Sequence, residues 1–219
     1  MTGLRPLSLL ALPPVLAVCA GLFPAPAHGA ALDTPSDPVA ETMTDSTEAM
    51  DAFRAKQEAV VEAVRAGASD AELQAKVDEL LDYEWLATAA LGGPKHYAKV
   101  CGERCGEFQG LLTQLIRANY LRMIRKAEKH PIEYVGQVAG RNGMFKVTTR
   151  LEIEKHGRRQ TVTVAYTMRQ TEGAWRVLDI ITDDVSLART YSYEFRKIVE
   201  KEGIAGVITR LEAKLDALD

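Results

Sequence analysis

The sequence predicts one α+β domain in which helices precede and follow a four-stranded antiparallel meander. Three observations predict it. Apolar residues recur at three- and four-residue steps over residues 46–129, the period changes to two over residues 132–182, and the helical period returns over residues 186–218. Helices segregated before and after one antiparallel sheet define the α+β class. Of the 219 residues, 47% are hydrophobic, which is ample for a buried core.

The first 30 residues have the pattern of a cleaved export signal. Arg5 precedes an apolar run from Leu7 to Phe23, small residues follow, and no acidic residue occurs in this segment. The run is too short and too poorly flanked for a transmembrane anchor. We therefore expect residues 1–30 to be removed and the mature chain to be exported. A lipoprotein attached through Cys19 is the alternative.

The mature chain begins with a leader and continues as the domain. Residues 31–45 hold two prolines, no aromatic and no basic residue, so we expect a disordered leader. Residues 46–219 form the single predicted domain.

Four helices are expected before the sheet. The first ends at Gly67, and Ser69 with Glu72 forms a capping box for the second. Asp82 caps a third, which ends at Gly92-Gly93-Pro94, and a long amphipathic helix runs from about Glu103 to Lys129. The apolar stripe of the first helix consists of Met50, Phe53, Val60, Val61 and Val64.

Four strands are expected in the segment of period two. They cover Ile132–Val138, Met144–Lys155, Thr161–Gln170 and Trp175–Thr182, with a hairpin turn at His156-Gly157. Alternation along them leaves one face of the sheet apolar and the other polar. Two closing helices, about 186–202 and 204–218, are separated by Gly203.

The motifs of an enzyme are missing, so we expect no catalytic activity. The mature sequence contains no G-x-S-x-G elbow, no H-E-x-x-H and no glycine-rich phosphate loop. His96, His130 and His156 fall in predicted turns and helix ends, where histidines are usually exposed. A small hydrolase with an unrecognised site is the minority hypothesis.

An acidic group and a cysteine pair are the remaining candidates for special chemistry. Asp179, Asp183 and Asp184 could offer oxygen ligands to a cation, but such a group is more often a solvated strand-to-helix loop, so we expect no metal. Cys101 and Cys105 are more plausibly bridged than free in an oxidising compartment. We expect a local disulfide at the entrance of a helix.

The charge distribution excludes one class of partner and suggests another. The net charge of −3 argues against a uniformly basic nucleic-acid binder. Residues 117–159 nevertheless hold 11 basic and 4 acidic residues, either an ordinary solvated face or a patch for anionic lipid or an acidic partner. The basic set is Arg117, Arg122, Arg125, Lys126, Lys129, Arg141, Lys146, Arg150, Lys155, Arg158 and Arg159.

The second half of the sequence carries a more specific pattern, which earlier positions extend to roughly residues 48–216. Its parts are Val164-Ala165-Tyr166-Thr167-Met168, Trp175-Arg176-Val177-Leu178-Asp179-Ile180, Val185-Ser186-Leu187, Tyr191, Phe195 and Gly203-Ile204, preceded by Tyr83, Leu91-Gly92, Phe108 and Tyr120. This pattern resembles the MlaC family of periplasmic phospholipid-binding proteins, also called the toluene-tolerance auxiliary family. Two departures are Asp184, where the family usually has glycine, and the Cys101/Cys105 pair, which replaces a polar or proline-containing stretch.

The resemblance implies a soluble phospholipid shuttle, with bound phospholipid as cargo and no cofactor. Nothing in the sequence requires a dimer, so we expect a monomer. Such proteins carry lipid between an outer-membrane lipoprotein complex and an inner-membrane ABC transporter, which maintains outer-membrane asymmetry. The acyl chains would lie in an apolar cavity between sheet and helices.

The residues that we expect to line this cavity come from the sheet face and from two helices. The sheet residues are Val147, Leu151, Ile153, Val162, Val164, Tyr166, Met168, Trp175 and Val177, and the helix residues are Leu112, Leu115, Ile116, Tyr120, Phe195, Ile198, Val199 and Ile208. The alternative is an exported, non-catalytic adaptor in which these residues form a solid core and the basic face docks a partner.

Overall fold

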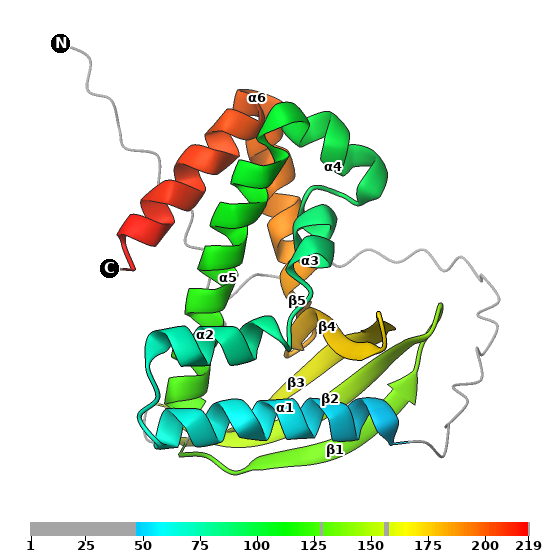
Figure 1. Cartoon of the computed structure of the whole chain (residues 1–219), viewed down its shortest axis with the longest axis vertical. Coiled ribbons are helices and arrows are strands. Elements are labelled where there is room, and N and C mark those ends of the chain that lie inside the picture. Colours follow the sequence, from blue (N-terminus) through cyan, green and yellow to red (C-terminus); the bar gives the residue numbers. More distant parts are fainter. Residues whose placement is uncertain (1–46, 128, 156–157, 219) are drawn as a thin grey trace, which may run out of the picture. The chain divides into compact units, whose positions relative to one another are not determined.

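A computed structural model of the chain describes residues 47–127, 129–155 and 158–218, all of which lie in one structural unit, Ala40–Asp219. Helices come first, a sheet follows, and a long helix closes the unit (Figure 1). The predicted export signal with Cys19, the leader and the His156-Gly157 turn lie outside the described residues.

The helical half contains five helices within the described residues. They are α1 (Glu48–Arg65), α2 (Asp70–Asp78), α3 (Tyr83–Ala90), α4 (Pro94–Cys101) and α5 (Cys105–Ala127), with the 3-10 turn η1 (Gly102–Arg104) before α5. The predicted stripe of α1 is buried at Phe53 and Val60. Gly67, with φ 72°, follows the end of α1 as predicted, because glycine adopts the left-handed conformation without a Cβ penalty.

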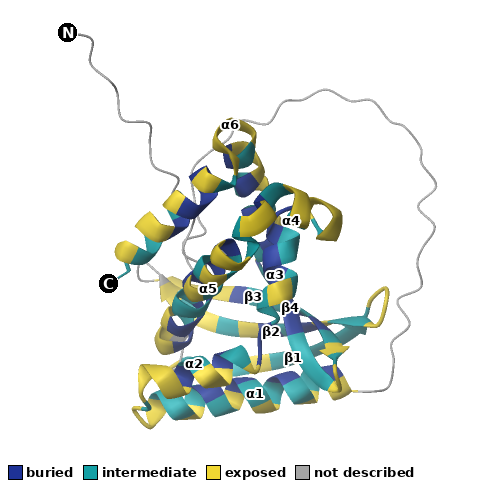
Figure 2. Ribbon diagram, turned by 45° about the horizontal axis from the view of Figure 1, so that its top comes forward, coloured by how far each residue is buried: buried dark blue, intermediate teal, exposed yellow. Residues whose placement is uncertain are grey.

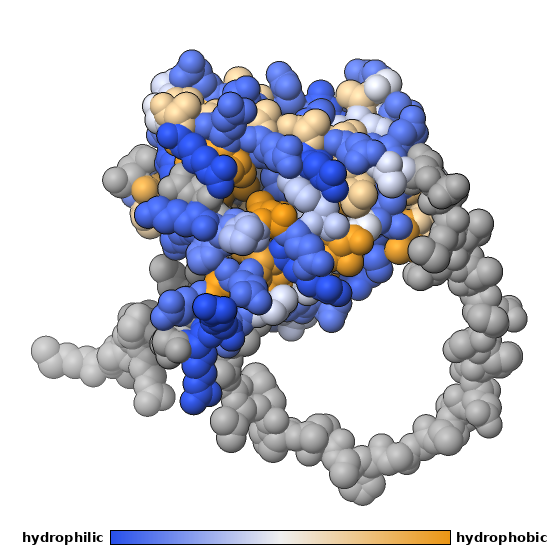
Figure 3. Space-filling view, turned by 90° about the horizontal axis from the view of Figure 1, so that it is seen from below, coloured by the Kyte–Doolittle hydropathy of each residue, from blue (hydrophilic) through white to orange (hydrophobic). Residues whose placement is uncertain are grey.

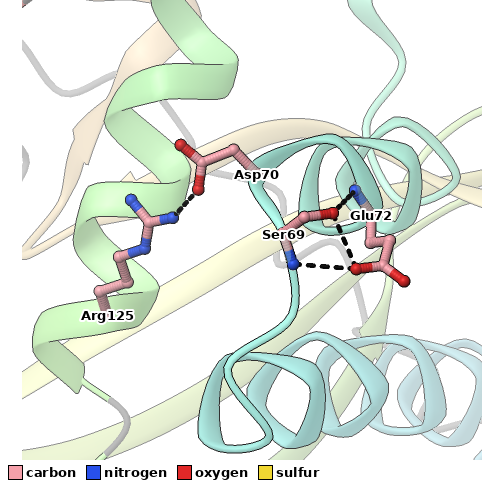
Figure 4. A network of polar contacts seen from close by, with 4 residues as sticks. All are labelled: Ser69, Asp70, Glu72 and Arg125. Atoms are coloured by element: carbon pink, nitrogen blue, oxygen red, sulfur yellow. Dashed lines mark hydrogen bonds and ion pairs between the residues drawn. The ribbon is translucent and has the colours of Figure 1, made fainter.

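The start of α2 has the predicted capping box (Figure 4). The Ser69 hydroxyl accepts from the Glu72 amide at 3.4 Å, and the Glu72 carboxylate accepts from the Ser69 amide at 2.9 Å. Asp70 of the same turn forms an ion pair with Arg125 of α5, which ties the two helices together.

Helix α4 was not predicted. Pro94 stands in its first turn, where the missing N–H costs nothing, and Gly93 precedes it with φ 97°. The sequence Gly92-Gly93-Pro94 therefore ends α3, as expected, but also starts another helix. The structure joins Cys101, the last residue of α4, to Cys105, the first of α5, in a disulfide with Cα atoms 4.8 Å apart.

The sheet has five strands, not the four predicted. Its order is β1-β2-β3-β4-β5, antiparallel throughout, and its strands are β1 (Ile132–Ala139), β2 (Met144–Lys155), β3 (Arg158–Thr171), β4 (Ala174–Thr182) and β5 (Val185–Ser186). Asp183 and Asp184 join β4 to β5 with φ 46° and 66°. A two-residue turn with both φ values positive matches the twist of paired strands. Because the turn contains no glycine, its sequence predicts an open loop and not a tight turn between paired strands.

Helix α6 (Leu187–Asp216) follows β5 directly and has one kink. Gly203 adopts the non-helical angles φ 65° and ψ −168°, so α6 consists of the two predicted closing helices, separated where expected. The Asp179 carboxylate holds the start of α6, because it accepts from the Ser186 hydroxyl at 2.6 Å and from the Ala188 amide at 2.9 Å.

The helices pack partly on the sheet and partly on one another. Helix α1 contacts β1, β2 and β4, whereas α5 and α6 contact each other together with α3 and α4. Figure 2 shows buried residues along the strands and on one side of the helices, with exposed residues on their outer sides. No described helix has the length and apolar character needed to cross a membrane.

Candidate functional site

The nine sheet residues proposed from the sequence share one face. Residues opposite each other in an antiparallel pair point to the same side, and Val147 pairs with Tyr166, Leu151 with Val162. Further pairs across β3 and β4 extend this face: Val164 with Thr182, Met168 with Val177 and Gln170 with Trp175. We call this side of the sheet the apolar face. The structure therefore brings together the sheet half of the predicted site.

Burial is deepest at the centre of the apolar face. Val147, Met168 and Val177 have no exposed surface, whereas Leu151, Ile153 and Trp175 near the strand ends are half-buried. The opposite side of β2 and β3 is polar, with Arg150 exposed and Thr163 and Thr167 half-buried. The apolar face is thus the side that the rest of the chain covers.

Helix α1 covers the apolar face, a position that its sequence does not predict. The Phe53 ring lies 4.1 Å from the Tyr166 ring and 6.4 Å from that of Tyr134 in β1, centre to centre. The Met50 amide donates to the Gln137 side chain at 2.8 Å. The stripe of α1 was visible in the sequence, but its period alone does not tell which surface it covers.

The α5 residues Leu112, Leu115, Ile116 and Tyr120 are all buried. Burial raises the pKa of the Tyr120 hydroxyl well above its ordinary value, and the nearby tyrosines Tyr166, Tyr83 and Tyr134 add to this rise.

The α6 residues do not all join the apolar face. Phe195 stacks on Tyr191 at 5.4 Å between ring centres and meets Phe108 of α5 edge-on at 5.8 Å. These contacts place Phe195 at the α5–α6 interface. Ile198 and Ile208 are buried and Val199 is half-buried. At Phe195 the predicted helix wall therefore takes part in the packing of α5 and α6 on each other.

A few polar side chains interrupt the apolar interior. Gln57 of α1, Thr149 of β2 and Tyr166 are almost fully buried. Burial raises the pKa of Tyr166, and hydrogen bonds with Thr149 and Gln57 partly oppose this rise. The Thr149 hydroxyl also donates to the Val164 carbonyl at 3.2 Å. Tyr134, at the rim of the same region, has its pKa raised to about 12, chiefly by burial and also by Glu58.

The residues considered for a metal or for catalysis are dispersed. Within the described residues, no three His, Cys, Asp or Glu side chains gather as a metal site would require. Asp179 holds the start of α6, and Asp183 accepts from the Thr163 amide at 3.3 Å. His96 is exposed on α4, His130 is half-buried, and His156 lies outside the described residues.

The basic residues are largely a solvated surface. Arg117 forms a two-pronged pair with Asp78 of α2, both bonds being 2.8 Å, and Arg125 pairs with Asp70. The remaining described members are exposed; they are Arg122, Lys126, Lys129, Arg141, Lys146, Arg150, Arg158 and Arg159. The side chain of Lys155 is outside the described set.

Large apolar side chains are seldom exposed on the described surface. Those most exposed are Val135, Val185 and Tyr193, at 42%, 48% and 51%. Figure 3, seen from below Figure 1, shows apolar side chains gathered near the centre of that face among hydrophilic ones.

These features define the class: an α+β protein with a meander sheet whose apolar face lies beneath helices. The chain belongs to the MlaC protein family, whose profile matches residues 44–213. A solved structure with the same fold is the phospholipid-binding protein from Ralstonia solanacearum, determined in complex with a phospholipid. It is 18% identical, with a TM-score of 0.61, and the match covers 80% of this chain and 99% of that one. No curated protein matches the sequence.

Proposed function

We propose that this chain is a phospholipid carrier of the periplasm that holds acyl chains in an apolar cavity between sheet and helices. It would shuttle lipid between outer-membrane and inner-membrane components of an Mla-type transport system. Membership of the MlaC family supports phospholipid binding, as does the structural neighbour that was solved with a phospholipid.

The observation that carries this proposal is the apolar face itself. Nine residues chosen from the sequence as cavity wall share that face, and α1 covers it through Phe53. We propose that the acyl chains separate α1 and α5 from this face, with Tyr120 and Phe53 on the helix side. The α6 residues Ile198, Val199 and Ile208 complete the proposed wall, and Phe195 supports it from the helix interface.

Energetics explain why a lipid needs such a carrier. Two acyl chains contain about 30 methylenes, and at ~0.8 kcal/mol each their exposure to water costs roughly 24 kcal/mol. Free energies of non-covalent binding saturate near ~18–21 kcal/mol. A protein interior can therefore hold a lipid about as tightly as a bilayer does, but not much more tightly. Transfer is then close to isoenergetic, and docking to a partner decides its direction. This mechanism needs no chemical step.

The proposed location has structural support in the cysteine pair. Disulfides persist in oxidising compartments and are rare in the cytosol of most organisms. The Cys101–Cys105 bond therefore favours an exported chain. We propose a monomer that meets its membrane partners in turn.

A transfer assay tests the carrier function. Donor vesicles with a labelled phospholipid and unlabelled acceptor vesicles are separated by a membrane that passes protein but not vesicles. We expect label in the acceptors at a rate proportional to protein concentration. A folded protein that leaves the rate at the buffer value would contradict the carrier and favour the adaptor with a solid core.

A further inference from the structure

Helix α1 holds a cation that lacks a hydrogen-bond acceptor. Among the described residues, six buried side-chain atoms have no hydrogen-bond partner, and only Nε of Arg54 belongs to a charged group. The other five are neutral; they are Oε1 of Gln57 and the hydroxyls of Tyr83, Tyr120, Thr171 and Thr182. A buried donor without a partner is costly, and more so when its group is charged. The N–H of Arg54 is therefore the donor that most requires an acceptor.

Arg54 lies at the edge of the apolar face, against the ring of Tyr134. Its guanidinium carbon is 4.6 Å from the centre of that ring, which belongs to β1, the first strand in the sheet order. One residue earlier in α1, the Phe53 ring lies 6.4 Å from the Tyr134 ring and 4.1 Å from that of Tyr166. Figure 1 shows α1 lying along β1. Phe53 therefore covers the apolar face, and the half-buried Arg54 stands at its rim.

No carboxylate of the described residues neutralises Arg54. Asp51 and Glu58 lie one helical turn before and after it in α1, but the Asp51 carboxylate accepts from the Thr47 hydroxyl. The four ion pairs between described residues all involve other arginines. The Tyr134 ring attracts the cation through its π electrons, and Nε still lacks an acceptor. An anion would thus meet Arg54 without displacing an ion pair.

The surroundings of Arg54 favour an anion that is attached to hydrocarbon. The apolar ring of Phe53 and the cation are adjacent, so one ligand that is apolar at one end and anionic at the other contacts both. A guanidinium binds phosphate oxygens with two parallel hydrogen bonds. No described strand lies beyond β1, so a headgroup at this edge stays in water while its chains lie beneath α1. A diacyl phospholipid has this arrangement of chains and phosphate.

We infer that Arg54, stacked on Tyr134, binds the phosphate of the carried phospholipid. This inference rests on the proposed function and deepens it, because it places the headgroup at the edge of the fold between α1 and β1. It also makes the phosphate, and not the chains alone, a determinant of affinity. A lipid with the same chains and no phosphate should therefore bind more weakly.

A competition between two lipids tests the site. Protein is equilibrated with vesicles that contain equal amounts of dioleoyl phosphatidylethanolamine and dioleoylglycerol, and the lipids bound to the separated protein are quantified by mass spectrometry. Comparing the ratio of bound lipids between wild type and a variant cancels the different tendencies of the two lipids to leave the bilayer. In Arg54→Gln, we expect the ratio of phospholipid to diacylglycerol to fall about tenfold, which corresponds to one hydrogen bond to a charged group. The total lipid per chain should not change.

Three further variants separate the role of Arg54 from charge and folding effects. Arg150→Gln makes the same change of charge on the polar side of the sheet and should keep the wild-type ratio. Arg54→Lys keeps the charge without the two-pronged geometry and should give an intermediate ratio. Arg54→Met keeps an unbranched apolar stem and should reproduce the fall seen in Arg54→Gln. Thermal unfolding verifies that each variant is folded.

An arm with inorganic phosphate distinguishes the headgroup from the free anion. Millimolar phosphate should leave the wild-type ratio unchanged, because the chains hold the lipid phosphate at a high local concentration. A ratio that falls to the value of Arg54→Gln would assign Arg54 to free phosphate and overturn the headgroup site.

The remaining outcomes separate this inference from the proposed function. A wild-type ratio in both Arg54→Gln and Arg54→Met, or an equal fall in Arg150→Gln, overturns the phosphate site and leaves the carrier intact. Wild-type protein that takes up neither lipid overturns both.

Discussion

At the scale of single residues, Val164 is a position where a substitution can distinguish loss of lipid binding from loss of the fold. It lies at the centre of the apolar face, 4% exposed, opposite Thr149 and Thr182. Its neighbour Thr163 points to the polar side of the same strand and is half-buried. The two positions therefore form a matched pair on one strand.

Val164→Trp should abolish lipid binding while the chain remains folded. The indole would occupy the space that we assign to an acyl chain, and overpacking of a core typically costs about 1–3 kcal/mol. Lipid extracted from the purified variant measures the effect. Thr163→Trp is the control and should retain lipid. A full complement of lipid in Val164→Trp would remove this residue from the wall.

Asp184 provides a second residue-scale prediction. Its φ of 66° is costly for a residue with a Cβ, and glycine adopts it without strain. Asp184→Gly should therefore raise the free energy of unfolding by about 0.5 kcal/mol, as measured by urea denaturation. Asp183→Gly should give no gain, because it also loses the bond from the Thr163 amide. Equal gains at both positions would argue against this explanation of the turn.

Single residues also show what the sequence could and could not predict. The alternation of Val162, Val164 and Tyr166 was sufficient to assign the apolar face, because the side-chain period of a strand is exactly two. Gln57 was missed, since a polar residue inside an apolar stripe looks like an interruption. Phe195 was expected to line the cavity, and the structure packs its ring against Phe108 and Tyr191, because periodicity does not tell which neighbour covers a side chain.

At the scale of elements, the sequence predicted those helices and strands whose hydrophobic pattern is regular over many residues. The capping box of α2, the length of α5 and the interruption of α6 at Gly203 all appear in the structure. Two short elements, α4 and β5, were not predicted. Helix α4 starts at Pro94 directly after Gly92-Gly93, residues that usually mark a loop, and β5 has two residues, too few to show a period.

The kink of α6 gives an element-scale prediction. Gly203 has φ 65° and ψ −168°, a conformation nearly restricted to glycine, and a Cβ there would touch nothing. Gly203→Ala should thus destabilise by roughly 1–3 kcal/mol through backbone strain alone. Gly110→Ala, inside α5 and equally free of contacts, should instead stabilise by about 0.5–1 kcal/mol. Urea denaturation of both variants measures the signs, and a neutral Gly203→Ala would disprove the strain.

At the scale of the whole molecule, buried tyrosines set the response to alkaline pH. Burial raises the pKa values of Tyr120, Tyr166 and Tyr191, and that of Tyr134 to about 12. Above pH 10 the unfolded chain loses these protons before the folded chain does. Stability should therefore be unaffected by them below pH 10 and fall as the pH rises toward 12.

Urea denaturation of wild type and Tyr166→Phe at pH 8 to 11 tests this response. The variant should lose less stability than wild type between pH 10 and 11, since one titrating group is gone. Parallel curves for the two proteins would show that Tyr166 contributes nothing to the alkaline loss.

The most direct test of the central claim is the lipid content of the protein itself. The chain is expressed with export, purified without detergent and analysed by native and denaturing mass spectrometry. Our account predicts one diacyl phospholipid per chain, released on unfolding. Repeated preparations that are fully folded, stable and free of lipid, and that take up none from vesicles, would contradict it.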